Sequence, residues 1–368
     1  MIFLILVLIH GLIHIFGFLK AFDLVDLNEL TIPVTRPAGF IWLMVSILFL
    51  TYGILNFTEV KNVWIIGFIA VLLSQLLVVY YWRDAKFATI PNIIILVAVL
   101  FSYSNQVFEN LIYKETSGLL SEIRYDNPAI LEENDIRHLP PPVQKWLLNS
   151  GAVGQSIIRN GRVEQKILMK MKPDQKNWYP AKAIQYTFID KPAFIWGVDV
   201  EMNTLMKFKG RDKFVDGKGE MLIKMNSLIK VVDEQGEKLD EGTIQRFLGE
   251  LVWFPSLAIS PYITWEHIDE FSAKATMNYK NTSGSGTFVF NENGDFVKFT
   301  TLRYNGNEPG AKRKEWVLTV DDYAVFENIK MPSKMKATWK LDEGDWTWLD
   351  LEIADIRYNE NARDINIQ

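Results

Sequence analysis

The sequence predicts a four-helix transmembrane bundle followed by an α+β domain, in which a curved antiparallel sheet forms a half-barrel filled by short helices. Residues 1–113 are almost entirely apolar and fall into four blocks separated by short charged loops. Residues 136–368 instead carry many short segments in which apolar and polar side chains alternate. An apolar run of about 20 residues matches a bilayer core, and a period of two is typical of strands. We therefore expect a transmembrane domain over 1–113, a linker over 114–135 and a soluble domain over 136–368.

Four apolar blocks have the length of a membrane span. They cover residues 1–19, 39–57, 63–82 and 90–108. A secretory signal peptide is the alternative for the first block, but no basic segment precedes Ile2 and no small-residue cleavage site follows Leu19. The first block is therefore expected to stay in the mature chain as a span.

Lysine and arginine residues in the short loops predict the orientation, because cytoplasmic loops carry an excess of them. Four lie in the first and third loops and two on the opposite side, namely Lys20, Arg36, Arg83 and Lys86 against Lys61 and Lys114. This count predicts a multi-pass membrane protein whose first and third loops lie in the cytoplasm and whose soluble domain lies on the extracytoplasmic side. The reverse topology is the alternative, since the margin is small.

His10 and His14 lie four residues apart in the first predicted span, and hence on one helical face. Polar groups at this depth are costly, so the pair should face the bundle interior. A metal or haem site or a proton relay is one hypothesis. The favoured one is hydrogen bonding across the bundle to Gln75, Ser74, Asn105 or Gln106, because no carboxylate lies in the apolar centres of the other spans.

Composition excludes several functions. The net charge is −5 without a dense basic patch, which argues against nucleic acid as a partner. Cysteine is absent, so the chain has no disulfide, thiolate nucleophile or cysteine metal site. We predict no cofactor and no metal site.

The soluble domain reads as a series of strands with helical interruptions. Proline is tolerated in a first helical turn, which predicts a short helix over 142–149. Candidate strands follow at 163–171, 183–189, 194–202, 273–279, 286–291, 296–304, 315–320, 335–341 and 346–357. Helices are expected at 220–231 and 241–254. In the second helix, Ile244, Phe247, Leu248, Leu251 and Val252 form one apolar face, which should pack on the concave side of a curved sheet as a plug or lid.

Two groups of residues are candidates for chemistry or binding in the soluble domain. His138 and His267 are its two histidines, and either could act as a general base, although no triad spacing or catalytic motif accompanies them. Aromatic and methionine side chains could line one apolar cavity for a lipid chain, with plain core packing as the alternative. The residues expected there are Trp196, Met202, Met221, Trp253 and Phe254.

Several segments of the sequence look familiar together. They are residues 9–14, 82–87, 139–144, 219–224, 231–233 and 252–255. The chain resembles an uncharacterised family of bacterial multi-pass membrane proteins with a C-terminal domain of unknown function. The resemblance implies a location in a bacterial cytoplasmic (inner) membrane. It brings no established activity and therefore assigns no catalytic residues. The order of strands and helices is also similar to that of lipoprotein-carrier half-barrels, which implies a curved sheet that holds acyl chains.

These observations favour a membrane-anchored domain that binds a hydrophobic ligand, either lipid or a lipidated protein, at the outer face of the cytoplasmic membrane. Membrane lipid is the expected partner. Two alternatives stay open: a hydrolase-like enzyme acting on a lipid or cell-envelope substrate, and a structural subunit of a membrane complex. A large exposed apolar patch would favour the last.

Overall fold

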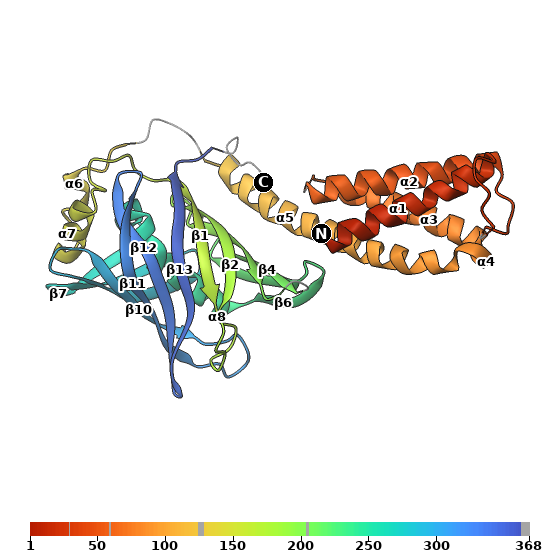
Figure 1. Cartoon of the computed structure of the whole chain (residues 1–368). Coiled ribbons are helices and arrows are strands. Elements are labelled where there is room, and N and C mark those ends of the chain that lie inside the picture. The colour runs from red at the N-terminus through yellow and green to blue at the C-terminus, as the bar shows by residue number, and fades with distance from the viewer. Residues whose placement is uncertain (29, 59, 124–128, 204–205, 362–368) are drawn as a thin grey trace. The chain divides into compact units, whose positions relative to one another are not determined.

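The computed structural model describes residues 1–28, 30–58, 60–123, 129–203 and 206–361. The chain divides into two compact units, Met1–Asn110 and Leu111–Gln368, which Figure 1 shows with their elements labelled. Residues 124–128 of the predicted linker and 362–368 at the end of the predicted soluble domain lie outside the described residues.

The first unit is a bundle of long apolar helices. They are α1 (Ile2–Ala21), α2 (Arg36–Phe57), α3 (Val63–Tyr80) and the part of α5 (Thr89–Ser121) up to Asn110, with the short α4 (Trp82–Ala85) and the 3-10 turn η1 (Lys86–Ala88) before α5. Among the described residues, four helical segments are long and apolar enough to cross a membrane. The predicted spans agree with these helices, except that the fourth helix extends beyond residue 108 to Ser121.

Small residues set the close packing of this bundle. A Cβ atom on Gly17 of α1 would lie 2.2 Å from the ring of Trp42 in α2. A Cβ atom on Gly67 of α3 would lie 2.6 Å from the ring of Tyr52, also in α2. Apolar helices gain little by hiding from equally apolar lipid, so such close contacts are a main source of attraction between them.

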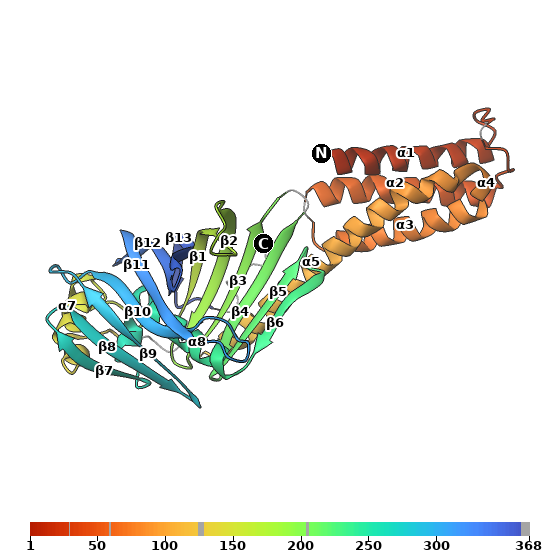
Figure 2. The ribbon, with the colours of Figure 1, turned by 90° about the horizontal axis from the view of Figure 1, so that it is seen from below.

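The second unit is built on one antiparallel sheet, drawn from two sides in Figures 1 and 2. Its described strands are β1 (Asn160–Met169), β2 (Tyr179–Phe188), β3 (Ala193–Glu201), β4 (Lys207–Val215), β5 (Lys218–Met225), β6 (Ile229–Gln235), β7 (Ile263–Asp269), β8 (Ser272–Tyr279), β9 (Thr282–Phe290), β10 (Phe296–Tyr304), β11 (Arg313–Phe326), β12 (Ile329–Leu341) and β13 (Gly344–Tyr358). Neighbours in sequence pair in two meanders, β1 to β6 and β7 to β13, and β1 pairs with β13 to join them.

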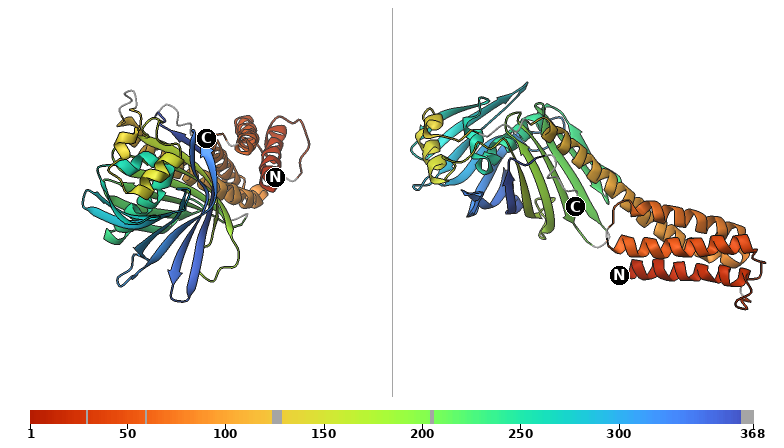
Figure 3. Two further views of the ribbon diagram at one scale, coloured as in Figure 1. Left: turned by 90° about the vertical axis from the view of Figure 1, so that its left-hand side faces the viewer. Right: turned by 90° about the horizontal axis from the view of Figure 1, so that it is seen from above.

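Helices lie inside the curve of this sheet. They are α8 (Glu237–Gly249), followed by the 3-10 turns η2 (Glu250–Trp253) and η3 (Pro255–Ile259). Thr243 of α8 packs against Gly219 on β5, and Ile244 packs against Gly284 on β9. These strands belong to opposite arms of the sheet, so the sheet must curl around α8, as the left view of Figure 3 shows. The predicted half-barrel with a plugging helix is confirmed.

The core of the second unit fills the space between α8 and the sheet. The ring of Phe247 on α8 stacks on Phe194 of β3 with centroids 6.4 Å apart and lies 6.0 Å from Phe214 of β4. All three side chains are fully buried. Truncation of a buried phenylalanine to alanine costs about 3–5 kcal/mol, so these contacts hold α8 firmly in place.

The helix predicted over 220–231 is wrong, because this segment forms the hairpin of β5 and β6. Met221 and Ile223 alternate with Leu222 and Lys224, and a mixture of apolar residues on both faces fits a helix as well as a strand. Asn226 and Ser227 decide the outcome, because both adopt the left-handed conformation of a tight turn, with φ of 48° and 59°.

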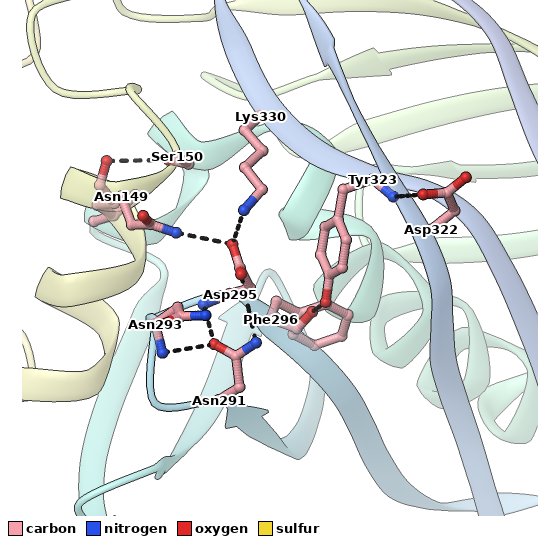
Figure 4. A network of polar contacts seen from close by, with 10 residues as sticks. Asn149, Ser150, Asn291, Asn293, Asp295, Phe296, Asp322, Tyr323 and Lys330 are labelled. Carbon is pink, nitrogen blue, oxygen red and sulfur yellow. Dashed lines mark hydrogen bonds and ion pairs between the residues drawn. The ribbon is translucent and has the colours of Figure 1, made fainter.

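Short helices close one end of the sheet. They are α6 (Glu133–Ile136) and α7 (Pro141–Asn149), and α7 confirms the helix predicted after the triple proline. Figure 4 shows how the end of α7 is attached: Asp295 accepts hydrogen bonds from Asn149 and Lys330 at 2.8 and 2.5 Å. Nearby, the Tyr323 hydroxyl donates to the carbonyl oxygen of Phe296 at 2.8 Å, and burial raises its pKa to about 12.

Candidate functional site

A cavity of about 270 Å³ lies between α8 and the concave face of the sheet. One wall comes from β1 and β3 to β6, another from β10 to β13, and α8 with η2 closes it. Most side chains around it are aromatic or aliphatic, with a few polar groups among them, which is typical of a small-molecule site. Such pockets measure about 300–1,000 Å³, so this one suits a single chain better than a whole two-chain lipid.

The structure brings together three of the five residues predicted to bind a ligand. Trp196 on β3, Met221 on β5 and Trp253 in η2 all line the cavity. Phe254 is buried elsewhere, with its ring 5.9 Å from that of Tyr358. Met202 follows β3, where its backbone N–H donates to the carbonyl oxygen of Met206. Neither Phe254 nor Met202 is part of this lining.

Arg246 of α8 is the centre of a polar cluster at the cavity wall. Its guanidinium group contacts Glu250 at 2.7 Å and Asp212 at 3.1 Å, and donates to Gln185 at 2.9 Å. It also lies over the ring of Trp196, 4.7 Å from the centroid. One guanidinium thus serves two carboxylates, an amide and an aromatic face, so its donors are committed within the protein.

The carboxylates of this cluster are held by further contacts. Glu250 also accepts a hydrogen bond of 2.6 Å from Gln185, which is fully buried on β2. Burial raises the pKa of Asp212 even though Arg246 acts in the opposite direction. A carboxylate in this position needs Arg246 as its partner, because an unpaired buried charge is strongly unfavourable.

Arg303 on β10 enters the same cavity without a carboxylate partner among the described residues. Its guanidinium carbon lies 5.0 Å from the ring centroid of Trp316 and 5.9 Å from that of Trp339. Burial and the charge of Arg246 lower its pKa from 12.5 to about 10 against the opposing charges of Asp212 and Glu250, and this pKa leaves Arg303 charged at neutral pH. Arg303 therefore brings a positive charge into the cavity. Its N–H donors form no ion pair with the described residues.

Tryptophans on three neighbouring strands form the wall beside Arg303. Trp316 of β11 pairs across the sheet with Trp339 of β12, which pairs in turn with Trp346 of β13. Trp348 is the extra residue of a β-bulge in β13, since its neighbours Thr347 and Leu349 pair with the adjacent residues Thr338 and Ala337, and it lines the cavity together with Trp346. We call these four residues, Trp316, Trp339, Trp346 and Trp348, the tryptophan wall, and all four line the cavity.

The indole N–H groups of this wall differ in their hydrogen bonding from those of Trp196 and Trp253, which line other sides of the cavity. The buried N–H groups of Trp316, Trp346 and Trp348 have no acceptor among the residues that the structure describes. By contrast, Trp196 donates to Gln165 at 2.9 Å, and Trp253 donates to the carbonyl oxygen of Pro332 at 3.1 Å. Buried donors are nearly always satisfied, so three open ones around one cavity require an explanation.

Sequence reasoning missed Arg246, Arg303 and the arrangement of the wall. The spacing of Trp346 and Trp348 predicted one shared face by the period of two, but a β-bulge at Trp348 breaks that period, and both side chains line the cavity together with Leu349. The pair of Trp316 and Trp339 gave no signal in the sequence, because the register that aligns these two residues depends on the pairing of β11 with β12.

The structure places His138 and His267 away from the cavity. Both side chains are exposed, and neither belongs to the lining. No hydrogen bond to either ring is found within the described parts of the chain. A general base must lie within reach of the proton that it removes in a shaped site, and these positions do not supply one.

A second polar cluster lies inside the helical bundle. His10 Nε2 is 2.8 Å from Asn92 Oδ1, and His14 Nε2 is 2.9 Å from Ser74 Oγ. His14 Nδ1 donates to the carbonyl oxygen of His10 at 2.8 Å. Asn92 also accepts from Ser74 at 3.0 Å and donates to Gln75 at 3.0 Å. The bundle network, defined as these five residues, thus gives each member at least one partner.

Sequence reasoning identified four of the five members of the bundle network. Ser74 and Gln75 lie beside the predicted histidine pair, whereas Asn105 and Gln106 bond to other groups, namely Glu109 and the Asn62 and Trp64 nitrogens. Asn92 was missed although it lies at the start of the fourth predicted span. In the described ranges, no group of three or more histidine, aspartate or glutamate residues could hold a metal ion.

Comparisons with known proteins agree with the resemblance seen in the sequence. Residues 129–351, more than half of the chain, match a family of unknown function, DUF6544. A comparison with curated protein sequences finds no match.

Two solved structures are similar to the chain. A LolA-superfamily protein from Nitrosomonas europaea is 10% identical, with 59% of this chain and 94% of that chain covered and a TM-score of 0.33. A β-barrel-like protein of the domain of unknown function DUF1849 from Brucella abortus is also 10% identical, with 55% and 99% covered and a TM-score of 0.23. By its match over residues 129–351, the chain belongs to the DUF6544 family of unknown function.

Proposed function

We propose that this protein is a membrane-anchored binding domain that holds a hydrophobic ligand in the cavity between α8 and the sheet. The cavity itself is the observation that carries the proposal. A space of about 270 Å³ remains beside fully buried core residues, although interiors are normally packed without such gaps. Its mostly apolar lining favours a ligand that brings an apolar chain out of water.

The apolar helices supply the second part of the proposal. Four segments able to cross a membrane would tether the binding unit to a bilayer, where membrane lipid or a lipidated protein is at hand. The distribution of lysine and arginine in the loops favours the outer face of a cytoplasmic membrane. Asp84 of α4 joins the first and third loops by accepting hydrogen bonds from Thr31 and the Ile32 N–H, both 2.8 Å, which agrees with those loops sharing one side.

Native mass spectrometry of the full chain, combined with lipid extraction, tests this function. The chain purified from its expression host should retain an apolar ligand at one copy per cavity. Met221→Trp, which fills the cavity from β5, should reduce the retained amount. Ile184→Trp, placed at an exposed position on β2, is the matched control and should retain it. Equal retention by both variants, or none by the unmodified chain, would refute the proposal.

A structural role in a membrane complex is favoured by a different surface. β6 is the edge strand of the described sheet, and Leu228, Ile229 and Val231 at its start are about half exposed. Exposed apolar side chains at an unpaired sheet edge are typical of a site for another chain. Ile229→Lys should release any partner that co-purifies with the full chain while the cavity keeps its ligand, and an unchanged set of partners would exclude this surface.

A further inference from the structure

Resting on the proposed function, we propose that the ligand of the cavity is an acidic amphiphile, whose oxyanion group binds Arg303 and the indole N–H groups of the tryptophan wall. The shared chemistry is a carboxylate or a phosphate ester at the end of a single alkyl chain. The remainder of the chain would lie along Met335, Leu349 and Leu351, which line the same cavity.

The two arginines of the cavity differ in their ion pairs: Arg246 forms two, and Arg303 forms none with the described residues. Asp212 and Glu250 both have Arg246 as their ion-pair partner, at 3.1 and 2.7 Å. Arg303 has two tryptophan rings beside it and no ion pair in the described parts of the chain. The charges of Asp212 and Glu250 act on Arg303 without forming an ion pair with it, and a ligand oxyanion would give this partly buried guanidinium group a direct, charged hydrogen-bond partner.

The second step is the imbalance of donors and acceptors. Trp316, Trp346 and Trp348 offer indole N–H groups that can only donate, and guanidinium N–H groups also only donate. The wall therefore supplies donors and lacks acceptors. A carboxylate or phosphate carries two or more acceptor oxygens, and hydrogen bonds to an ionised acceptor are about twice as strong as neutral ones.

The third step excludes the opposite chemistry. A cationic ligand could lie on the tryptophan faces, but Arg303 already occupies the faces of Trp316 and Trp339. A neutral alkane would leave Arg303 and the three N–H groups as they are. An alcohol has one oxygen for this set of donors, whereas an oxyanion can reach several of them at once.

Photoaffinity labelling of the full chain in phosphatidylcholine nanodiscs tests the inference. Three probes with the same diazirine-bearing twelve-carbon chain end in a carboxylate, a phosphate or an alcohol. Mass spectrometry of peptides from β10 to β13 measures the concentration of each probe that half-saturates labelling. The acid or the phosphate should label the cavity at least tenfold more tightly than the alcohol, and the tighter of the two identifies the head group.

Variants of Arg303 then test whether its guanidinium group causes the tighter binding of the acidic probe. Arg303→Met should weaken binding of the acidic probe about ten- to hundredfold, which is the loss expected for a charged hydrogen bond. Binding of the alcohol probe should stay unchanged. Arg303→Lys should restore part of the loss. Arg313→Met is the matched control, because Arg313 on the neighbouring strand pairs with Glu241 outside this lining, and it should change none of the probes.

The outcomes separate this inference from the proposed function. Equal binding of acid, phosphate and alcohol, with Arg303→Met changing none of them, would overturn the head-group inference and leave a hydrophobic site. No labelling of β10 to β13 by any probe would refute the proposed function itself. If Arg303→Met does not fold, Trp346→Phe and Trp348→Phe keep the aromatic rings and remove only the N–H groups. Both variants should weaken binding of the acidic probe and leave binding of the alcohol probe unchanged. An unchanged affinity for the acidic probe would again overturn the inference.

Discussion

The bundle network and the tryptophan wall are both polar groups in apolar surroundings, but they differ in how completely the protein satisfies them. In the bundle network, His10, His14, Ser74, Gln75 and Asn92 bond to one another. In the tryptophan wall, three buried N–H groups lack acceptors among the residues that the structure describes, and the nearby Arg303 forms no ion pair with any of those residues. A cluster whose hydrogen bonds are all formed within the protein stabilises the packing of its helices, whereas a cluster with open donors can bind the acceptor groups of a ligand.

The same difference separates the two arginines of the cavity. Arg246 is bound by Asp212, Glu250 and Gln185, while Arg303 lies over tryptophan rings. Four changes test this comparison, and they follow in order of expected effect on the free energy of unfolding.

Arg246→Met should give the largest loss of stability. It leaves the carboxylates of Asp212 and Glu250 without their ion-pair partner, and breaking a buried pair costs about 3–5 kcal/mol. Arg303→Met should cost far less, since among the described residues Arg303 forms no ion pair, and it acts on Asp212 and Glu250 only through its charge. Urea unfolding of the full chain in detergent, followed by circular dichroism, measures both. Equal losses for the two variants would contradict the distinction between them.

Asn92→Ala should give the next largest effect, because it strips the bundle network of its central member. His10, Ser74 and Gln75 each lose a hydrogen bond, and such bonds in membranes average about 0.6 kcal/mol with a maximum near 1.7. We expect a loss of about 2 kcal/mol in a detergent unfolding assay. Thr58→Ala, which loses only contacts to its own helix, is the control and should change little.

Trp253→Phe should destabilise the second unit more than Trp316→Phe does. Both changes keep an aromatic ring, but the first leaves the carbonyl oxygen of Pro332 without the Trp253 donor, whereas the second removes an N–H group that has no acceptor in the described part of the chain. An abandoned buried partner costs about 1–3 kcal/mol, so the two variants should differ by about 1 kcal/mol or more. A greater loss for Trp316→Phe would show that its N–H group is satisfied after all.

His138→Ala and His267→Ala should have the smallest effects. Both side chains are exposed and lie outside the cavity, so each change should stay within about 0.5 kcal/mol of the unmodified chain. Binding of the acidic probe should also be unchanged. A loss of binding in either variant would revive the hypothesis that these histidines act on the ligand.

Much of the fold could be predicted from the sequence, because length and period are local properties. The apolar blocks predicted the helices that are long and apolar enough to cross a membrane, and the face formed by Ile244, Phe247 and Leu251 predicted that α8 packs inside a curved sheet. The hairpin of β5 and β6 was missed because its residues fit the period of a helix as well as that of a strand. The Asn226–Ser227 turn is the feature that decides for the hairpin.

The candidate site was less predictable, because its parts meet only in the fold. Trp196, Met221 and Trp253 could be named from residue type alone. Arg246 and Gln185 contact each other across 61 positions of sequence, and no local pattern reports such a pair. Whether an indole N–H group has an acceptor also depends on strand register and on the helix packed above it, so the open donors of the wall become visible only in three dimensions.

The most direct test of this account is the chemical environment of the indole N–H groups themselves. Nuclear magnetic resonance of the full chain in nanodiscs, with tryptophans labelled at the indole nitrogen and assigned by single Trp→Phe variants, can follow each N–H group during titration with laurate. The account predicts that the signals of Trp316, Trp346 and Trp348 shift to the values of hydrogen-bonded groups, while those of Trp196 and Trp253 stay in place. Unchanged wall signals at saturating laurate, or the same shifts with dodecanol, would contradict it.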